Sequence, residues 1–191
     1  MQINESIIRS IETKQRILSD PELIERIGKV ADCCITAFRN GKKVLFCGNG
    51  GSAADAQHLA AELSGRFYYD RAPLPSEALH VNTSYLTAVA NDYSFDEVYS
   101  RMINGSGQEG DVLIALSTSG NSPNIVKALE SARAKGMKTV VLTGESGGKA
   151  KNGCDYLINV PSKDTPRIQE SHIMIGHIIC EIVESTLFPL K

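Results

Sequence analysis

Two side chains that can exchange protons stand one helical turn apart in this sequence. His58 and Glu62 lie in the stretch Ala53–Leu63, whose pattern of apolar residues predicts a helix. Residues four apart share a helix face, so the imidazole and the carboxylate point the same way, and Asp55 could orient the imidazole from one turn earlier. Such a pair can act in acid–base chemistry or bind a metal ion. The spacing alone is also typical of a solvated polar face, and by itself favours that interpretation.

A second set of polar side chains lies on the long helix predicted from Thr165-Pro166 to about Ser185. Gln169 and His177 fall within about 80° of each other around this helix, but about 12 Å apart along it. His172 sits nearer the main apolar stripe, so we interpret it as a core histidine with its hydrogen bonding satisfied. His177 taken alone is nearly as ambiguous.

A glycine-rich segment, Cys47-Gly48-Asn49-Gly50-Gly51-Ser52-Ala53, follows the apolar run Val44–Cys47. Glycines let the backbone turn sharply and approach a ligand, and the helix that follows offers free N–H groups. The spacing also matches a relaxed dinucleotide fingerprint, but the second predicted strand ends at His80-Val81-Asn82 without the acid that would hold a ribose. Dinucleotide binding is therefore disfavoured, and a tight turn without a ligand stays open.

Hydroxyl groups are concentrated in a second loop, directly after the apolar run Val112–Leu116. Four of the six residues from 117 to 122 carry one, namely Ser117, Thr118, Ser119 and Ser122. Hydroxyls, backbone N–H groups and a helix dipole together form an anion site. The loop has no lysine and no P-loop ending, which favours a monophosphate held without Mg²⁺ over ATP. Helix capping would need only one hydroxyl, so we interpret the loop as a phosphate site.

The dipeptide Asn91-Asp92 follows a short helix predicted over Tyr85–Ala90. These residue types are typical of turns at helix ends. They could equally supply polar groups to a sugar, and their spacing does not decide between the two interpretations.

The elements that must position these residues form an α/β pattern. Short apolar runs alternate with helical stretches, which predicts a doubly wound, five-stranded parallel sheet flanked by helices. The predicted strands are Val44–Cys47, Ala78–Val81, Val112–Leu116, Thr139–Leu142 and Tyr156–Val160, and the helices between them include Ala53–Leu63, Tyr85–Ala90 and Asn124–Ala134. We expect one domain over residues 1–191, with a helical extension over 1–40 and the α/β core and C-terminal helix over 41–191.

The extension reads as two helices, the second opening at Asp20-Pro21 as N-cap and first helical residue and ending near Asn40-Gly41. Its apolar residues recur at helical spacing, so we expect a buried face made of Leu23, Ile24, Ile27, Val30, Ala31 and Cys34. The final helix is apolar on two sides, with Ile168, Ile175, Ile179, Ile182 and Thr186 on one and Ile173, Gly176 and Cys180 on the other. We expect the second side to contact another subunit.

Composition excludes several classes of protein. The 191 residues have a net charge of −2 and are 42% hydrophobic, as expected of a soluble globular protein and not of a dedicated nucleic-acid binder. No apolar run is long enough for a membrane span, and Met1–Arg16 does not resemble a signal peptide, so we expect cytoplasmic residence and no membrane partner. The five cysteines form no CxxC pair, which predicts reduced thiols and no cysteine-based zinc site.

Taken in order, these motifs resemble the phosphoheptose isomerases of the sugar isomerase (SIS) domain superfamily. The resemblance rests on Cys47–Ser52, on His58 with Glu62-Leu63-Ser64-Gly65-Arg66, on Asn91-Asp92, on Leu116–Ser122 and on Arg167-Ile168-Gln169-Glu170 with His177. It covers essentially the whole chain. It implies an SIS-type sheet, a homotetramer with sites near subunit interfaces, one Zn²⁺ per subunit, and interconversion of sedoheptulose 7-phosphate and D-glycero-D-manno-heptose 7-phosphate. That reaction begins heptose synthesis for lipopolysaccharide or related surface glycans.

The resemblance also implies roles for individual residues. Ser117, Thr118, Ser119 and Ser122 would hold the phosphate. Asn49, Gly50, Gly51, Asn91 and Asp92 would line the sugar chain, with Ser52 near them and Glu62 and Gln169 also touching substrate. His58, Glu62, Gln169 and His177 would be the metal ligands, and Glu62 and His177 the acid–base pair. A carboxylate bound to Zn²⁺ is a weaker base, so Glu62 can hardly fill both roles at once.

The chemistry suits these residue types. Aldose–ketose isomerisation moves a proton between adjacent carbons through an enediol, with a base at carbon and an acid or electrophile at oxygen. The alternative is a non-enzymatic relative that binds the replication initiator DnaA. That relative lacks the acid at the Glu62 position and the histidine at the His177 position, both present here. The resemblance therefore favours the enzyme.

Overall fold

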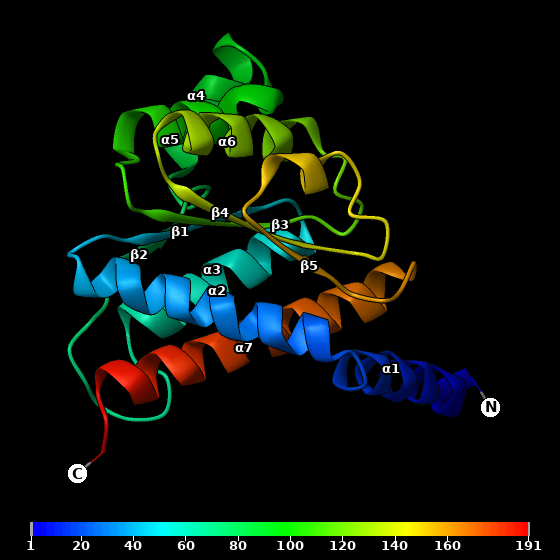
Figure 1. Ribbon diagram of the computed structural model, residues 1–191. Coiled ribbons are helices and arrows are strands. Elements are labelled where there is room, and N and C mark those ends of the chain that lie inside the picture. The colour runs from blue at the N-terminus through cyan, green and yellow to red at the C-terminus, as the bar shows by residue number, and fades with distance from the viewer. Residues whose placement is uncertain (1, 191) are drawn as a thin grey trace.

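The computed structural model describes residues 2–190 and is built on one parallel sheet of five strands (Figure 1). The strands are β1 (Val44–Gly48), β2 (Ser76–Ala78), β3 (Val112–Leu116), β4 (Lys138–Thr143) and β5 (Tyr156–Asn159), in the order β2-β1-β3-β4-β5. The strand β2 lies on one side of β1, and β3, β4 and β5 follow on the other side. The strand order therefore reverses between β1 and β3. Ligands of open parallel sheets bind outside the carboxyl ends of the strands at such a point.

Helices cover both faces of the sheet, as predicted for a doubly wound fold. They are α1 (Gln2–Leu18), α2 (Pro21–Arg39), α3 (Gly51–Ser64), α4 (Thr83–Asp92), α5 (Val98–Ser106), α6 (Pro123–Ala134) and α7 (Thr165–Leu187), with short 3₁₀ turns η1 (Phe95–Glu97) and η2 (Ala150–Gly153). Figure 1 shows α2, α3 and α7 on one face and α4, α5 and α6 on the other. Each face has its own apolar core.

The central strands β1 and β3 are buried at every position. They pair in register from Val44 with Val112 to Gly48 with Leu116, so both end at the same level. The glycine-rich loop and the hydroxyl loop therefore begin side by side at the carboxyl edge of the sheet. This register places the two motifs that the sequence singled out on either side of the switch point.

The second strand was predicted too late in the chain. Ala78–Val81 was expected, but β2 ends at Ala78. The ladder contributes one further bond, from Leu79 N–H to Phe46 O, before the chain leaves the sheet. Asn82 then caps α4, its side chain accepting from Tyr85 N–H at 3.0 Å, and this cap draws Val81 into a half-exposed turn.

The two-helix extension is confirmed, including the Asp20 cap, whose side chain accepts from Leu23 N–H at 2.9 Å. Ile24 is a correction, because its side chain is 45% exposed and not part of the buried face. It stands at the edge of the apolar arc of α2, where packing is incomplete. The helix α5 lay outside the predicted elements.

The second apolar side of α7 meets the same chain, which corrects the expectation that another subunit covers it. Gly176 faces Leu59 of α3 so closely that a Cβ at Gly176 would overlap the leucine side chain. All five cysteines are free, as predicted. Cys34, Cys47 and Cys180 are buried, whereas Cys33 and Cys154 are only half-buried. Among residues 2–190, no helix is both long and apolar enough to cross a membrane.

Candidate functional site

The side chains of His58, Glu62 and His177 converge on one point. His58 Nε2 lies 2.9 Å from Glu62 Oε1 and 3.1 Å from His177 Nε2. His58 is exposed, whereas the other two are half-buried. The polar face predicted for α3 is therefore not simply solvated, because α7 supplies a third group 119 residues away in sequence. We call these three residues the His–Glu–His cluster.

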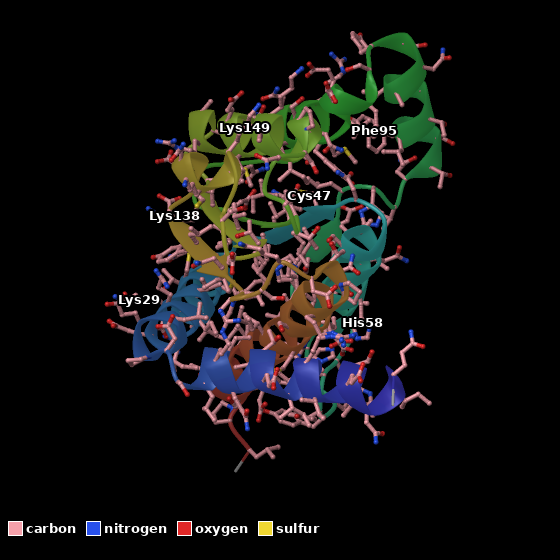
Figure 2. All side chains as sticks on the ribbon, turned by 90° about the vertical axis from the view of Figure 1, so that its right-hand side faces the viewer. Lys29, Cys47, His58, Phe95, Lys138 and Lys149 are labelled. Carbon is pink, nitrogen blue, oxygen red and sulfur yellow. The ribbon has the colours of Figure 1, made fainter. Side chains whose placement is uncertain are left out.

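Parallel packing of α3 and α7 creates the cluster. Gly51 lies against Gln169 at the start of the two helices, and Leu59 lies against Gly176 two turns further on. Because Gly176 has no side chain, the helices approach closely enough for His177 to reach His58. Figure 2 shows His58 low on the molecule, on the side away from Lys29 and Lys138.

The cluster fits a divalent metal. One ligand atom from each residue lies within 4.8 Å of the others, and imidazole nitrogen with carboxylate oxygen is a donor set that zinc accepts. Ligands of tetrahedral zinc stand about 3.3 Å apart, close to the two contacts within the cluster. Beside it, Asp55 has a buried Oδ2 without a hydrogen-bond partner. Burial raises the pKa of Asp55, and His58 and His177 oppose that rise.

Gln169 lies about two helical turns from His177, as its sequence spacing requires. Its side chain packs on Gly51, where a Cβ would stand 2.5 Å from Gln169 Nε2. The structure thus brings Gln169 to the first turn of α3 and not into contact with the other three predicted metal ligands. The sequence had already indicated that its ligation on a straight helix is awkward.

In the first turn of α3, Gly51 N–H makes no hydrogen bond within the described residues. Ser52 N–H donates to Asn49 O at 3.1 Å, and the next two N–H groups donate to Gly50 O. Gly50 has a φ of 57°, which only glycine adopts readily, and stands at the N-cap without a side-chain cap hydrogen bond. Ser52 is buried in this turn. The glycine-rich segment is therefore a strand-to-helix turn that leaves Gly51 N–H available to an anion or a polar ligand.

Asn49 is engaged in a way the sequence did not reveal. Its side-chain amide donates to Asn124 Oδ1 at 2.9 Å and accepts from Asn124 Nδ2 at 2.8 Å. Asn124 is buried in the first turn of α6, so this pair ties the loop after β1 to the loop after β3. The hydroxyl group of buried Tyr99 donates a hydrogen bond to Gly48 O. Asn124 and Tyr99 shape the crevice, but no motif marked them.

The hydroxyl loop surrounds the N-terminus of α6. Ser122 is the N-cap residue but makes no side-chain cap hydrogen bond, and its Oγ lies 3.5 Å from Ser117 Oγ. Gly120 N–H donates to Ser117 Oγ at 3.2 Å, and Asn121 N–H donates to Ser119 Oγ at 3.2 Å. The hydroxyls therefore stay in the loop and are not used for plain capping. Thr118 and Ser119 also border a neighbouring groove of about 310 Å³.

The remaining candidates are separated from the cluster. Asn91 and Asp92 form the exposed last turn of α4, where Asn91 Nδ2 donates to Asp92 Oδ1 at 2.9 Å. That helix lies on the face of the sheet opposite α3 and α7 (Figure 1). His172 is fully buried, with Nε2 3.2 Å from Thr143 O, and burial lowers its pKa to about 4. It is a core histidine, as predicted, but its hydrogen bonding is not fully satisfied as expected, because buried Nδ1 has no partner.

Comparison with known proteins agrees with this fold. A family model described as "SIS domain" matches residues 10–144. A phosphoheptose isomerase of Aneurinibacillus thermoaerophilus is 55% identical over 189 residues, 99% of this chain and 96% of the relative. One of Clostridium acetobutylicum is 53% identical over 189 residues, again 99% and 96%. The solved structure of a phosphoheptose isomerase from Neisseria gonorrhoeae has a TM-score of 0.90 at 41% identity, covering 96% of this chain and 97% of that one.

These matches span both the sheet and the helices that carry the His–Glu–His cluster. Within the SIS-domain proteins, the chain belongs to the phosphoheptose isomerase family. The predicted resemblance is confirmed, and with it the SIS-type fold. The comparisons do not support the DnaA-binding alternative.

Proposed function

We propose that the chain is an isomerase that interconverts sedoheptulose 7-phosphate and D-glycero-D-manno-heptose 7-phosphate. The observation that carries the proposal is the His–Glu–His cluster, in a chain 55% identical over nearly its whole length to a phosphoheptose isomerase. The cluster supplies both a carboxylate and an imidazole, the two groups that a proton shift between adjacent carbons requires.

The phosphate end of the substrate is assigned to the hydroxyl loop. Ser117, Thr118, Ser119 and Ser122 hold the phosphate, together with Asn124 N–H at the start of α6. Support comes from the Ser122 hydroxyl, which is not used as a cap. Since the charge is met by hydroxyls and amides, the site needs no lysine, in keeping with the loop's composition.

The sugar chain runs from this loop past the first turn of α3 towards the cluster. Gly50, Gly51 and Ser52 line it with backbone and hydroxyl groups, and Gln169 reaches it beside Gly51. Seven residues of helix separate Gly51 from His58, about 10 Å, which suits an extended seven-carbon chain. Asn49 shapes this path through Asn124. Asn91 and Asp92, in the exposed last turn of α4, are also proposed to contact the sugar chain.

Glu62 and His177 carry the chemistry. Glu62 takes the proton from one carbon and returns it to the neighbouring carbon, and His177 exchanges a proton with the substrate oxygens. Glu62 Oε1 faces His58, which leaves Oε2 for the substrate. A zinc ion on Oε1 would weaken the carboxylate as a base, so its two proposed roles oppose each other. Anchoring the remote phosphate holds the reacting carbons in place between the two groups.

The zinc ligands proposed are His58, Glu62, His177 and Gln169, with one Zn²⁺ per subunit. Zinc bound there would supply a positive charge that polarises the substrate carbonyl. The first three already converge, while Gln169 needs a rotated side chain or a different subunit to join them. We further propose a homotetramer acting in the cytoplasm, feeding heptose to lipopolysaccharide or a related surface glycan.

The test is turnover of sedoheptulose 7-phosphate by the purified chain, followed as appearance of the aldose. We expect activity that a strong chelator removes and Zn²⁺ restores. Glu62→Gln should lower kcat by orders of magnitude while substrate still binds, because the base is lost and the phosphate site is untouched. Absence of turnover in the intact, zinc-loaded chain would refute the proposal.

A further inference from the structure

A buried ion pair lies directly behind the His–Glu–His cluster. Arg71 Nε donates to Glu184 Oε1 at 2.9 Å, and the two side chains are only 2% and 1% exposed. Glu184 lies on α7, two turns beyond His177, and Arg71 lies in the loop that follows α3. None of the motifs considered above included either residue.

The arginine caps the end of α3. Its guanidinium donates to Glu62 O and to Leu63 O, both at 2.8 Å, and also to Gly65 O at 3.2 Å. The last carbonyls of a helix have no partner within the helix and carry its partial negative charge, so a cation is well placed there. Arg71 is thus hydrogen-bonded to the backbone of Glu62 itself.

The glutamate fixes the segment between α3 and Arg71. Its carboxylate accepts from Phe67 N–H at 2.9 Å and from Tyr68 N–H at 2.7 Å, in addition to Arg71. The Phe67 ring in turn contacts His177, with ring centroids 5.6 Å apart. Burial alone would raise the pKa of Glu184, but the two N–H groups and Arg71 outweigh it and lower that pKa. The carboxylate is therefore charged, and both of its oxygens accept hydrogen bonds from these donors.

We propose that Arg71 and Glu184 are positioning residues, which hold Glu62 and His177 at the separation that acid–base chemistry and zinc binding require. A buried ion pair is weak support for stability as such, since its desolvation cost offsets its attraction. The pair instead fixes how α3 and α7 lie relative to each other. Arg71 is bonded to the Glu62 backbone, and Glu184 stands on the helix that carries His177. The inference rests on the proposed function of the cluster.

The chain contains a matched control at the amino ends of β1 and β3. Asp111 also has a 1% exposed carboxylate that accepts from a lysine, Lys43 Nζ at 2.6 Å, and from two backbone N–H groups, those of Lys43 and Gln108. Its hydrogen bonds reach only Lys43 and Gln108, which stand before β1 and β3, and none of them reaches α3 or α7, which carry the cluster. Asp111→Asn should therefore lower stability as Glu184→Gln does, without touching the cluster.

The experiment compares Glu184→Gln, Arg71→Lys and Asp111→Asn with the parent chain. Zinc affinity is measured by competition with a chromogenic chelator, and the imidazole resonances of His58 and His177 are recorded by NMR without zinc. We expect Glu184→Gln and Arg71→Lys each to lower zinc affinity about 10- to 100-fold, as substitutions of residues that support metal ligands do. Both variants should also shift the two imidazole resonances. In kinetics, kcat should fall while KM changes little, because the phosphate loop is not involved. Asp111→Asn should leave all these values unchanged.

A result in which Glu184→Gln lowers the melting temperature like Asp111→Asn, yet keeps zinc affinity, imidazole shifts and kcat, overturns the inference. Should Glu184→Gln not fold, Arg71→Lys gives the same comparison. This variant keeps a cation beside Glu184 and loses only the several guanidinium hydrogen bonds to the α3 carbonyls. Failure of the proposed function is distinguishable, because the parent would then show no turnover while the imidazole shifts still test the positioning.

Discussion

At the scale of single residues, burial decides what a titratable group does. Four histidines occur in the sequence, and the structure separates two of them by environment. His58 stands exposed beside Glu62 and His177, whereas His172 is sealed under Thr143 O. The sequence predicted the burial of His172 correctly from its place on the apolar stripe, but not the unpartnered Nδ1. It could not decide the role of His58 from spacing, because the deciding neighbour, His177, comes from another helix.

His172 should make the chain less stable in mild acid. Its pKa is 6.5 when free and about 4 when buried, so the unfolded chain binds more protons between these values. Stability is therefore fully present above pH 6.5 and falls as pH is lowered towards 4, by about 2 kcal/mol at pH 5. Urea unfolding at pH 7, 6 and 5 measures this slope. His172→Gln should flatten it, and an equal slope in the two proteins would contradict the assignment.

At the scale of elements, the decisive feature is how closely α3 approaches α7. Gly176 permits this contact, and a Cβ there would press on the side chain of buried Leu59. The helices themselves were predictable from apolar periodicity and from caps such as Asp20. Their parallel contact was not, because a glycine in an apolar helix gives no sign of which partner it faces. The Arg71–Glu184 pair was missed for the same reason, since its members are 113 residues apart.

Two glycine-to-alanine substitutions should have opposite effects. Gly176→Ala overfills the α3–α7 contact and should cost about 1–3 kcal/mol of unfolding free energy. Gly28→Ala, in α2, has nothing within 4 Å of the new Cβ and should stabilise the chain by about 0.5–1 kcal/mol. Denaturant unfolding compares both with the parent. Zinc affinity should fall in Gly176→Ala alone, and a stable Gly176→Ala with full affinity would show that the contact tolerates a wider spacing.

At the scale of the whole molecule, exposed apolar side chains lie on α1 and not on the second side of α7, where the sequence suggested a subunit contact. The second side of α7 is covered by α3, but α1 extends from the layered body with isoleucines in solvent (Figure 1). Ile3, Ile7, Ile8 and Ile11 are 49–76% exposed. The helix is tied to α7 beside this stripe, where Arg167 donates to Ser6 O at 2.6 Å and where Ile7 and Ile11 border a groove shared with Arg167. Its orientation is thus fixed while the isoleucines stay largely exposed.

This stripe should form the contact between subunits of the proposed tetramer. Ile3, Ile7 and Ile11 lie within about 80° around the helix, and burying each fully would stabilise the assembly by about 1.5–3 kcal/mol. Light scattering should give the mass of four chains for the parent and a smaller mass for Ile7→Glu, because a buried carboxylate without a partner opposes association. Arg9→Gln makes the same change of charge off the stripe and should keep the parent mass. A parent of single-chain mass would refute the tetramer, and an unchanged Ile7→Glu would assign the contact to another surface.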